Sequence, residues 1–268
     1  MPKSFDDVLA EVLHLNAIAA QCKHLLLYRG QSSRDWRLDS TFVRTVKAQL
    51  LKMNPSDGFS ERLRKSADLN SMLSSLLLLK FGGLSEPSAE LHAAAAEHGV
   101  DPWFELMKRY QQYPDEDMQE LRGTNLIDWS RSYDVALHFA NESRRGPGAL
   151  FVCDATATGK TLQIVPVFEL LTKIRTQLKN DAANGSPLLF SPKKQIAYER
   201  AKNQQAVYFA QMDLRLDLLE SWRVYETALV DETILIKIVL PAGSESDCES
   251  YLNKNGVARS FIYPDSKA

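Results

Sequence analysis

The chain has 268 residues, of which 44% are hydrophobic and 25% charged, a composition typical of a folded globular protein rather than a disordered one. Its 32 Lys and Arg residues and 34 Asp and Glu residues give a net charge of −2, so no overall field attracts nucleic acid or an anionic membrane. The three cysteines show no CxxC spacing, which argues against a disulfide framework or a zinc ribbon and favours a cytoplasmic protein. Apolar runs are too short for a transmembrane helix, and the polar N-terminal residues lack the order of a secretion signal.

The first half of the chain is predicted to be mostly helical. Ser4 and Asp7 have the spacing of a capping box, and helically spaced apolar residues follow, which predicts a helix over 5–21. A short apolar run then predicts a strand over 24–28, bounded by Arg29 and Gly30. Further helices are expected over 59–80, over 87–96, and from an N-cap and proline at 101–102 to a break at 113–115.

The second half mixes strands and helices. Strands are expected over 125–129, 149–153 and 161–167, and a hairpin over 222–230 and 233–240. Helices are expected over 130–141, with Ser130 as the N-cap, and over 168–179 and 244–254. We therefore predict an α+β fold: one domain over 1–268 with a mixed or antiparallel sheet core and a helical insertion at about 45–118.

Common catalytic and metal-binding motifs are absent from the sequence. There is no HExxH, GxSxG or GxGxxG, and the five histidines are dispersed, so no metal site is predicted. Residues 157–161 (ATGKT) end like a phosphate-binding loop. Position 154, however, is Asp where that loop needs Gly, and the residues that follow favour a strand over the required helix. A turn between two strands is the better interpretation.

The segment Tyr28-Arg29-Gly30-Gln31 is one of two that carry chemical information. An arginine after an apolar strand lies where a sheet ends, and its planar fork suits phosphate or carboxylate. Gly30 provides for a close backbone approach or for a positive φ. The commoner role for a buried arginine is an internal ion pair, for which Asp128 is the natural partner.

The second informative segment is the strand that ends in Asp128-Trp129-Ser130. Asp128 has three roles open to it: capping the next helix, pairing with Arg29, or facing a ligand. The helix that follows places Val135, Ala136, Phe139 and Ala140 on one stripe. We therefore expect the core to include Leu126, Trp129, Ala136 and Phe139.

Taken together and in this order, the segments resemble the FRG domain family, over about residues 23–265. The motifs that carry the resemblance are Tyr28-Arg29-Gly30, Trp36, Leu38, Arg44, Thr124–Ser130, Val135–Ala140, Arg200, Gln204, Ala206, Tyr208, Ile234–Leu240 and Pro264-Asp265. The sequence departs from the family where a Gln-His-x-Gly-x-Pro motif usually precedes the Thr-x-Leu-Leu-Asp-Trp strand. Met118–Gly123 here has no histidine, so any role of that histidine is missing. Ala206 and Tyr208 stand where the family has Gly and Phe.

The motif order is also similar to that of the ADP-ribosyltransferase fold, which implies NAD as the ligand. By this resemblance Arg29 holds the pyrophosphate, Ser130 is the middle element, and Gln204 stands where a glutamate usually positions the ribose. Glutamine cannot stabilise a cationic transition state as an anion would. A carboxylate near Arg29, such as Asp128, Glu199 or Glu226, would favour catalysis if Arg29 does not neutralise it.

Two functions from different classes follow from the resemblance. One is an enzyme of the ADP-ribosyltransferase type, an effector in bacterial or phage-related defence, with Arg29, Asp128, Ser130 and Gln204 as its catalytic set. The other is a noncatalytic module that binds a nucleotide or a protein partner in the same pocket. In both cases these residues should converge on one cleft. The expected ligand-binding residues are Tyr28, Gly30, Gln31, Trp129 and Arg200.

Overall fold

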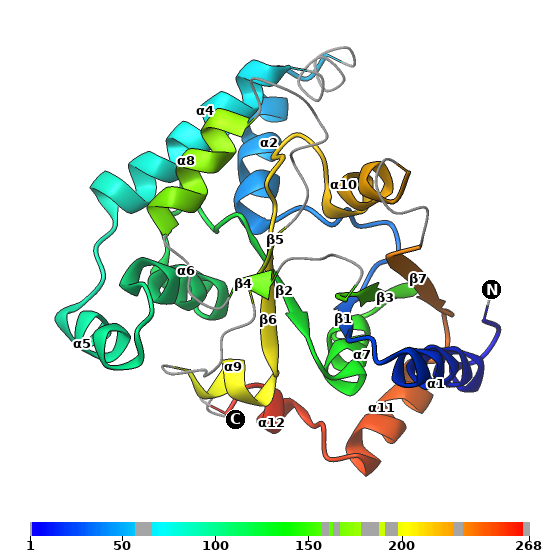
Figure 1. The fold of residues 1–268 in the computed structure, drawn as a ribbon. Coiled ribbons are helices and arrows are strands. Elements are labelled where there is room, and N and C mark those ends of the chain that lie inside the picture. Colours follow the sequence, from blue (N-terminus) through cyan, green and yellow to red (C-terminus); the bar gives the residue numbers. More distant parts are fainter. Residues whose placement is uncertain are drawn as a thin grey trace.

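A seven-stranded sheet forms the centre of the described part of the chain (Figure 1). The structure is a computed structural model that describes residues 2–56, 66–156, 161–162, 167–177, 188–190, 198–227 and 233–264. The strands lie in the order β4-β5-β6-β2-β1-β3-β7, antiparallel except for β4 and β5, so the α+β fold with a mixed sheet is confirmed. Their bounds are β1 Leu26–Gln31, β2 Leu126–Ser130, β3 Gly148–Asp154, β4 Thr161–Leu162, β5 Leu188–Phe190, β6 Ala206–Ala210 and β7 Leu235–Leu240.

The centre of the sheet is its weakest join. Six residue pairs connect β1 with β3, and five connect β2 with β6. Only the pair Tyr28 and Ser130 connects β1 with β2. The sheet therefore consists of two well-paired halves that meet at a short central seam between β1 and β2.

Helices surround the two halves of the sheet. In Figure 1 the helices α2, α4, α5, α6 and α8 lie beside the half that contains β2, and α1, α7 and α11 beside the half that contains β1. One apolar cluster, which includes Ile127, Trp129 and Phe151, spans both halves on the face covered by α10. The helix bounds are α1 Phe5–Cys22, α2 Thr41–Met53, α4 Ala67–Leu79, α5 Ala89–His98, α6 Pro102–Gln112, α7 Tyr133–Asn141, α8 Val167–Gln177, α9 Glu199–Asn203, α10 Leu218–Tyr225, α11 Glu245–Lys254 and α12 Arg259–Ile262. No helix of the described segments has the length and apolar character that crossing a membrane requires.

The helices between β1 and β2 are joined to the sheet by a buried lysine. After α4 the chain forms one π-helical turn, Lys80–Leu84, and the Lys80 side chain is fully buried. Its ammonium donates to the Asp117 carboxylate at 2.8 Å and to the carbonyls of Leu121 and Gly123 at 2.8 and 2.6 Å. All three of its protons are therefore used, and the segment that leads into β2 is held in place.

Gly30 allows α7 to lie directly on β1. A Cβ atom at this position would come within 1.8 Å of the Ala136 carbonyl oxygen and 2.4 Å of the Ala140 nitrogen. Of the two roles open to Gly30, close backbone approach is therefore the one that the structure requires. No other residue type fits between this strand and this helix.

Several predicted elements are confirmed. The helix at Phe5 begins with the predicted capping box, and α6 begins at Pro102 with Asp101 as N-cap. The helix α11 lies where a C-terminal helix was expected. Residues 57–65, at the start of the helix predicted over 59–80, and the loop-like residues 157–160 lie outside the described residues.

Other predicted elements are wrong. Ser130 ends β2 and is not a cap; the N-cap of α7 is Ser132, because the Ser130 hydroxyl is engaged elsewhere. Residues 222–225 belong to α10 and not to a strand, since Asp217 and Glu220 form a capping box that starts a helix. In the predicted strand 161–167, only 161–162 are described as strand, and Val167 begins α8. Residues 163–166 and the predicted hairpin turn at 231–232 are outside the described residues.

The predicted core is correct except at one residue. Leu126, Trp129 and Ala136 are buried, as expected. Phe139 is only partly buried, and Leu137 is buried in α7 instead. Phe139 keeps an exposed edge because it lines a cavity.

Candidate functional site

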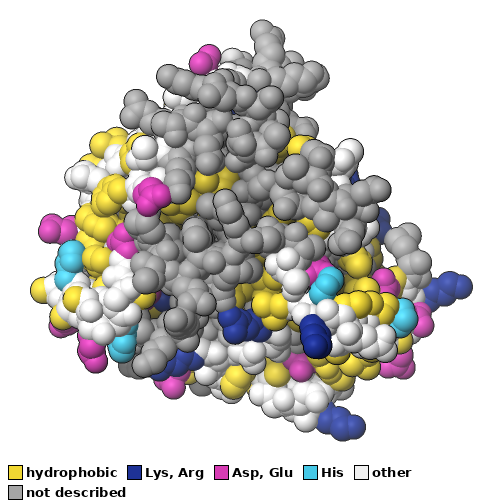
Figure 2. All heavy atoms as spheres, in the orientation of Figure 1, with side chains coloured by type: hydrophobic (Ala, Val, Ile, Leu, Met, Phe, Trp, Pro, Cys, Tyr) yellow, Lys and Arg dark blue, Asp and Glu magenta, His cyan; other side chains and the backbone are white. Residues whose placement is uncertain are grey.

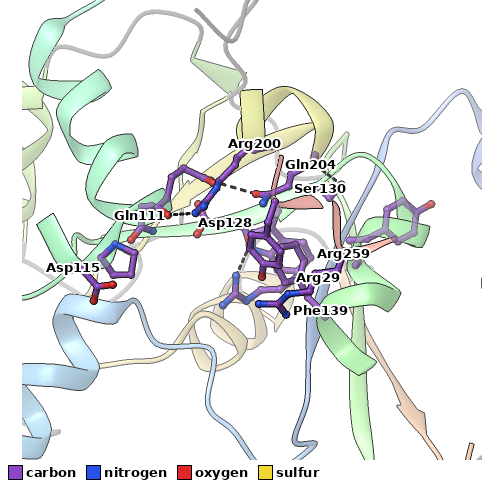
Figure 3. Close-up of a pocket in the computed structure, with 17 residues that line it drawn as sticks. Arg29, Gln111, Asp115, Asp128, Ser130, Phe139, Arg200, Gln204 and Arg259 are labelled. Atoms are coloured by element: carbon purple, nitrogen blue, oxygen red, sulfur yellow. Dashed lines mark hydrogen bonds between the residues drawn. The ribbon is translucent and has the colours of Figure 1, made fainter. Parts of the chain in front are cut away.

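A cavity of about 520 Å³ opens at the seam between β1 and β2. Its walls come from both halves of the sheet and from four helices, so segments distant in sequence meet there (Figure 3). The lining residues are Tyr28, Arg29, Gly30, Gln111, Gln112, Pro114, Asp115, Asp128, Trp129, Ser130, Ala136, Phe139, Arg200, Gln204, Ala206, Arg259 and Tyr263. The predicted convergence of Tyr28, Arg29, Asp128, Ser130 and Gln204 on one cleft is confirmed.

The sequence predicts that Arg29 follows the end of the first strand. In the structure Arg29 lies within that strand, β1. Its Nη1 donates a hydrogen bond to the backbone carbonyl of Asp128, which bridges the seam where the strands are not paired. Its Nε is buried without a hydrogen-bond partner among the described residues, and no described carboxylate forms an ion pair with it. Burial lowers the pKa of Arg29 to about 10, although the nearby Asp128 acts in the opposite direction.

Asp128 faces the cavity from the other side of the seam. Its Oδ1 is buried and has no hydrogen-bond partner in the described part of the chain. Burial raises the pKa of Asp128 to about 6, although Arg29 and Arg44 both act to lower it. Of the three roles open to Asp128, helix capping is excluded because Ser132 caps α7. A carboxylate ion pair with Arg29 is also absent, so the side chain that faces the cavity is not neutralised by a direct contact.

Ser130 and Gln204 hold the cavity wall together. The Ser130 hydroxyl donates to the Gln204 carbonyl at 2.7 Å and accepts from the Ser132 backbone N–H at 2.9 Å. The Gln204 carboxamide accepts from Gln112 and donates to the carbonyl of Ile262, both at 3.3 Å. The only hydroxyl proton of Ser130 is thus committed to a structural bond, and both residues join β2 and α9 to their neighbours.

Two arginines and two tyrosines form an alternating stack along the third wall. The Arg200 guanidinium lies 4.6 Å from the ring centre of Tyr113 and 5.4 Å from that of Tyr263. Arg259 lies 5.0 Å from the same Tyr263 ring. Cation–π contacts of this kind hold a guanidinium plane in a defined orientation.

Eight of the nine site residues predicted from the sequence line the cavity. Gln31 is the exception: it is buried, and its Nε2 donates to the Arg37 carbonyl at 3.3 Å. Gln31 is the last residue of β1, and its carboxamide is engaged with the loop that follows the strand. Glu199 and Glu226 do not line the cavity, and the Glu226 carboxylate accepts from two backbone N–H groups.

The lining residues of α6 and of the C-terminal segment were not among those predicted from the sequence. Gln111 and Gln112 lie in the predicted insertion, where no motif distinguished them from a solvated helix face. Arg259 and Tyr263 are next to the C-terminal Pro264 that the family pattern includes, which is the signal that could have found them. In Figure 3, Asp115 lies at one end of the group and Arg259 with Phe139 at the other.

The side chains that line the cavity suit a ligand that carries both charged groups and a ring. Three arginines and two aspartates line it, together with aromatic side chains and carboxamides. On the face shown in Figure 2, the coloured Lys and Arg side chains are interspersed with acidic and hydrophobic ones and do not form one continuous basic patch. In the described segments, no three or more His, Cys, Asp and Glu side chains are grouped to hold a metal ion. No protein-family model, curated protein or solved structure matches the chain.

Proposed function

We propose that the chain binds a nucleotide of the NAD or ADP-ribose class in the cavity between β1 and β2. One observation supports this most: Arg29 Nε and Asp128 Oδ1 are both buried without hydrogen-bond partners among the described residues, and both residues line the same cavity. A buried polar atom without a partner costs free energy, so two such atoms in one cavity favour a ligand that supplies the missing bonds.

The two groups suit different parts of one ligand. The Arg29 guanidinium is a donor fork that matches a phosphate oxygen pair. The Asp128 carboxylate is an acceptor and suits a ribose hydroxyl, which donates a proton. Phe139, Trp129 and Tyr263 supply apolar surface for a ring, and a volume of about 520 Å³ falls in the range of small-molecule sites.

The resemblance to the FRG domain family and to the ADP-ribosyltransferase fold favours NAD among the nucleotides. It also supports a role as an effector in bacterial or phage-related defence. Transfer of ADP-ribose is a second candidate function, favoured by Asp128, whose carboxylate is not paired with Arg29. Against transfer, Gln204 supplies no negative charge and its carboxamide is already bonded, which favours a noncatalytic module.

Calorimetric titration with NAD, ADP-ribose and ATP tests the proposal, with adenosine as the phosphate-free control. We expect the phosphorylated ligands to bind and adenosine to bind at least tenfold more weakly. Release of nicotinamide from NAD, compared between wild type and Asp128→Asn, then separates transfer from binding alone. A chain that binds none of the three phosphorylated ligands contradicts the proposed function and favours a protein partner.

A further inference from the structure

Glu142, at the end of α7, holds two lining residues of the cavity although it does not line the cavity itself. Its Oε1 accepts from Arg259 Nη1 at 2.6 Å, and its Oε2 accepts from the Tyr263 hydroxyl at 2.9 Å. One carboxylate therefore binds both residues that the C-terminal segment contributes to the wall. Burial and the bond to Glu142 both raise the pKa of Tyr263, the direction expected for a hydroxyl that donates to a carboxylate.

The rest of this segment is attached to α9 and the residue that follows it. Asn203 Nδ2 donates to the Phe261 carbonyl at 2.8 Å, and Gln204 Nε2 donates to the Ile262 carbonyl at 3.3 Å. The Ile262 side chain is fully buried. The backbone at 261–262 is thus anchored on one side, whereas Arg259 and Tyr263 reach across to Glu142 on the other.

We propose that Glu142 is a positioning residue of this site, which fixes the segment Arg259–Tyr263 as a wall of the cavity. The proposal rests on the proposed nucleotide-binding function for its effect on a ligand. Its physical basis is the long Arg259 side chain, which is 69% exposed and would sample many rotamers without a partner. The charge-assisted bond to Glu142 restricts the rotamers of Arg259. Because the guanidinium is planar and rigid, the same bond also fixes the orientation of its other nitrogens.

The same contact orders Tyr263. Its ring lies between Arg200 and Arg259, at 5.4 and 5.0 Å from the two guanidinium carbons. Loss of the Glu142 carboxylate therefore disturbs both the arginine at the end of the stack and the ring that separates the two arginines. Preorganised groups of this kind lower the ordering cost of binding a ligand.

Limited trypsin digestion tests the contact without any ligand. Trypsin cuts after Arg259 only when the segment leaves its position, so release of the peptide that begins at Ser260 reports local opening. We expect Glu142→Gln to release this peptide roughly five- to tenfold faster than wild type. The matched control is Glu220→Gln: Glu220 also pairs with an arginine and is 27% exposed, against 26% for Glu142, but it does not line or support the cavity. The control should leave this release rate unchanged.

Titration of the same proteins with ADP-ribose and NAD tests the effect on the ligand. We expect affinity to fall three- to tenfold in Glu142→Gln and to stay at the wild-type value in Glu220→Gln, with melting temperatures compared for both. Tyr263→Phe, which removes only the hydroxyl, should show a smaller loss in the same direction. Faster release with weaker binding supports the positioning role.

The alternative outcomes separate the two proposals. Release at the wild-type rate, or faster release with unchanged affinity, overturns the role of Glu142. If the wild type binds no nucleotide, the proposed function fails, and the release rate alone then decides whether Glu142 holds the segment. A fall in affinity that the control variant reproduces would trace the effect to lost stability and would also overturn the role.

Discussion

The buried carboxyl group of Asp128 lowers the stability of the native state when it is charged, and it also faces the candidate ligand site. Burial raises its pKa to about 6, so the native state holds this proton over a pH range in which the unfolded chain, with an ordinary pKa near 4, has lost it. The native state is therefore favoured below about pH 4 and loses this contribution as the pH rises through 6. A carboxylate kept at such a cost is typical of functional sites.

Asp128→Asn should therefore stabilise the chain at pH 8 and not at pH 4. The amide has nearly the same shape but carries no charge to desolvate, which predicts a gain of about 1–3 kcal/mol in the free energy of unfolding at pH 8. Thermal melts of both proteins at several pH values measure the difference. A gain that does not depend on pH would show that charge burial is not the cause.

Arg29→Lys separates ligand binding from structure at the other unpartnered group. Lysine keeps the charge, but it loses the fork geometry that suits phosphate. We expect affinity for ADP-ribose to fall more than tenfold, which corresponds to about 1.4 kcal/mol, with little change in melting temperature. Normal affinity with a much lower melting temperature would show that Arg29 is a structural residue and does not bind the ligand.

At the scale of elements, α7 packs against Gly30 of β1 and also forms part of the cavity wall. The helix can approach β1 only because Gly30 has no side chain, and it then carries Phe139 to the cavity and has Glu142 as its C-cap. The Tyr-Arg-Gly motif thus places an arginine and, through its glycine, a helix wall.

Gly30→Ala should be among the most destabilising substitutions to alanine in this chain. The new Cβ would overlap the Ala136 carbonyl, so the helix must shift, and we expect a loss of more than about 3 kcal/mol. Gly146→Ala is the control, because nothing lies within 4 Å of a Cβ there. Denaturant unfolding measures both. A loss below about 1 kcal/mol for Gly30→Ala would mean that α7 moves away from β1 easily.

Elements with local signals could be predicted from the sequence, and those that depend on tertiary contacts could not. The capping boxes and the proline at 102 set helix starts through contacts within one turn. Ser130 has the same local signal, but its hydroxyl bonds to Gln204, which is distant in sequence. The helix α10 is a miss of another kind: Asp217 and Glu220 form a capping box, a local signal, but the apolar pattern at 222–225 also fits a strand, which was the prediction.

At the scale of the whole molecule, two halves of a sheet depend on side chains to stay together. The helices between β1 and β2 are held through Lys80, whose three bonds reach Asp117 and the chain before β2. Residues of β1, β2, β3, β6 and β7 share one apolar cluster with α10, so this cluster crosses the seam. These links predict that the chain unfolds as one unit.

Lys80→Met tests this dependence. The substitution leaves the Asp117 carboxylate buried without its ion-pair partner, and we expect a loss of about 3–5 kcal/mol. Circular dichroism and tryptophan fluorescence should still report one coincident transition, shifted to lower denaturant. Two separate transitions would show that the helices between β1 and β2 unfold apart from the rest.

The candidate site shows the same division between local and distant information. Arg29, Asp128 and Gln204 were found because each lies in a short segment with a recognisable order of residue types. Gln111 and Gln112 reach the cavity only because α6 packs beside it, and nothing in their own segment marks them. The sequence also could not show that the Ser130 hydroxyl and the Gln204 carboxamide are committed to holding the wall.

The single residue pair between β1 and β2 has a consequence for the exchange of amide hydrogens with solvent. One edge of β1 forms six ladder pairs with β3, whereas its other edge is paired with β2 only at Tyr28 and otherwise faces the seam. Backbone N–H groups alternate between the two edges of an antiparallel strand, so deuterium should label β1 at every second amide. The order in which these amides acquire deuterium would thus outline the cavity from the backbone alone, before any ligand is known.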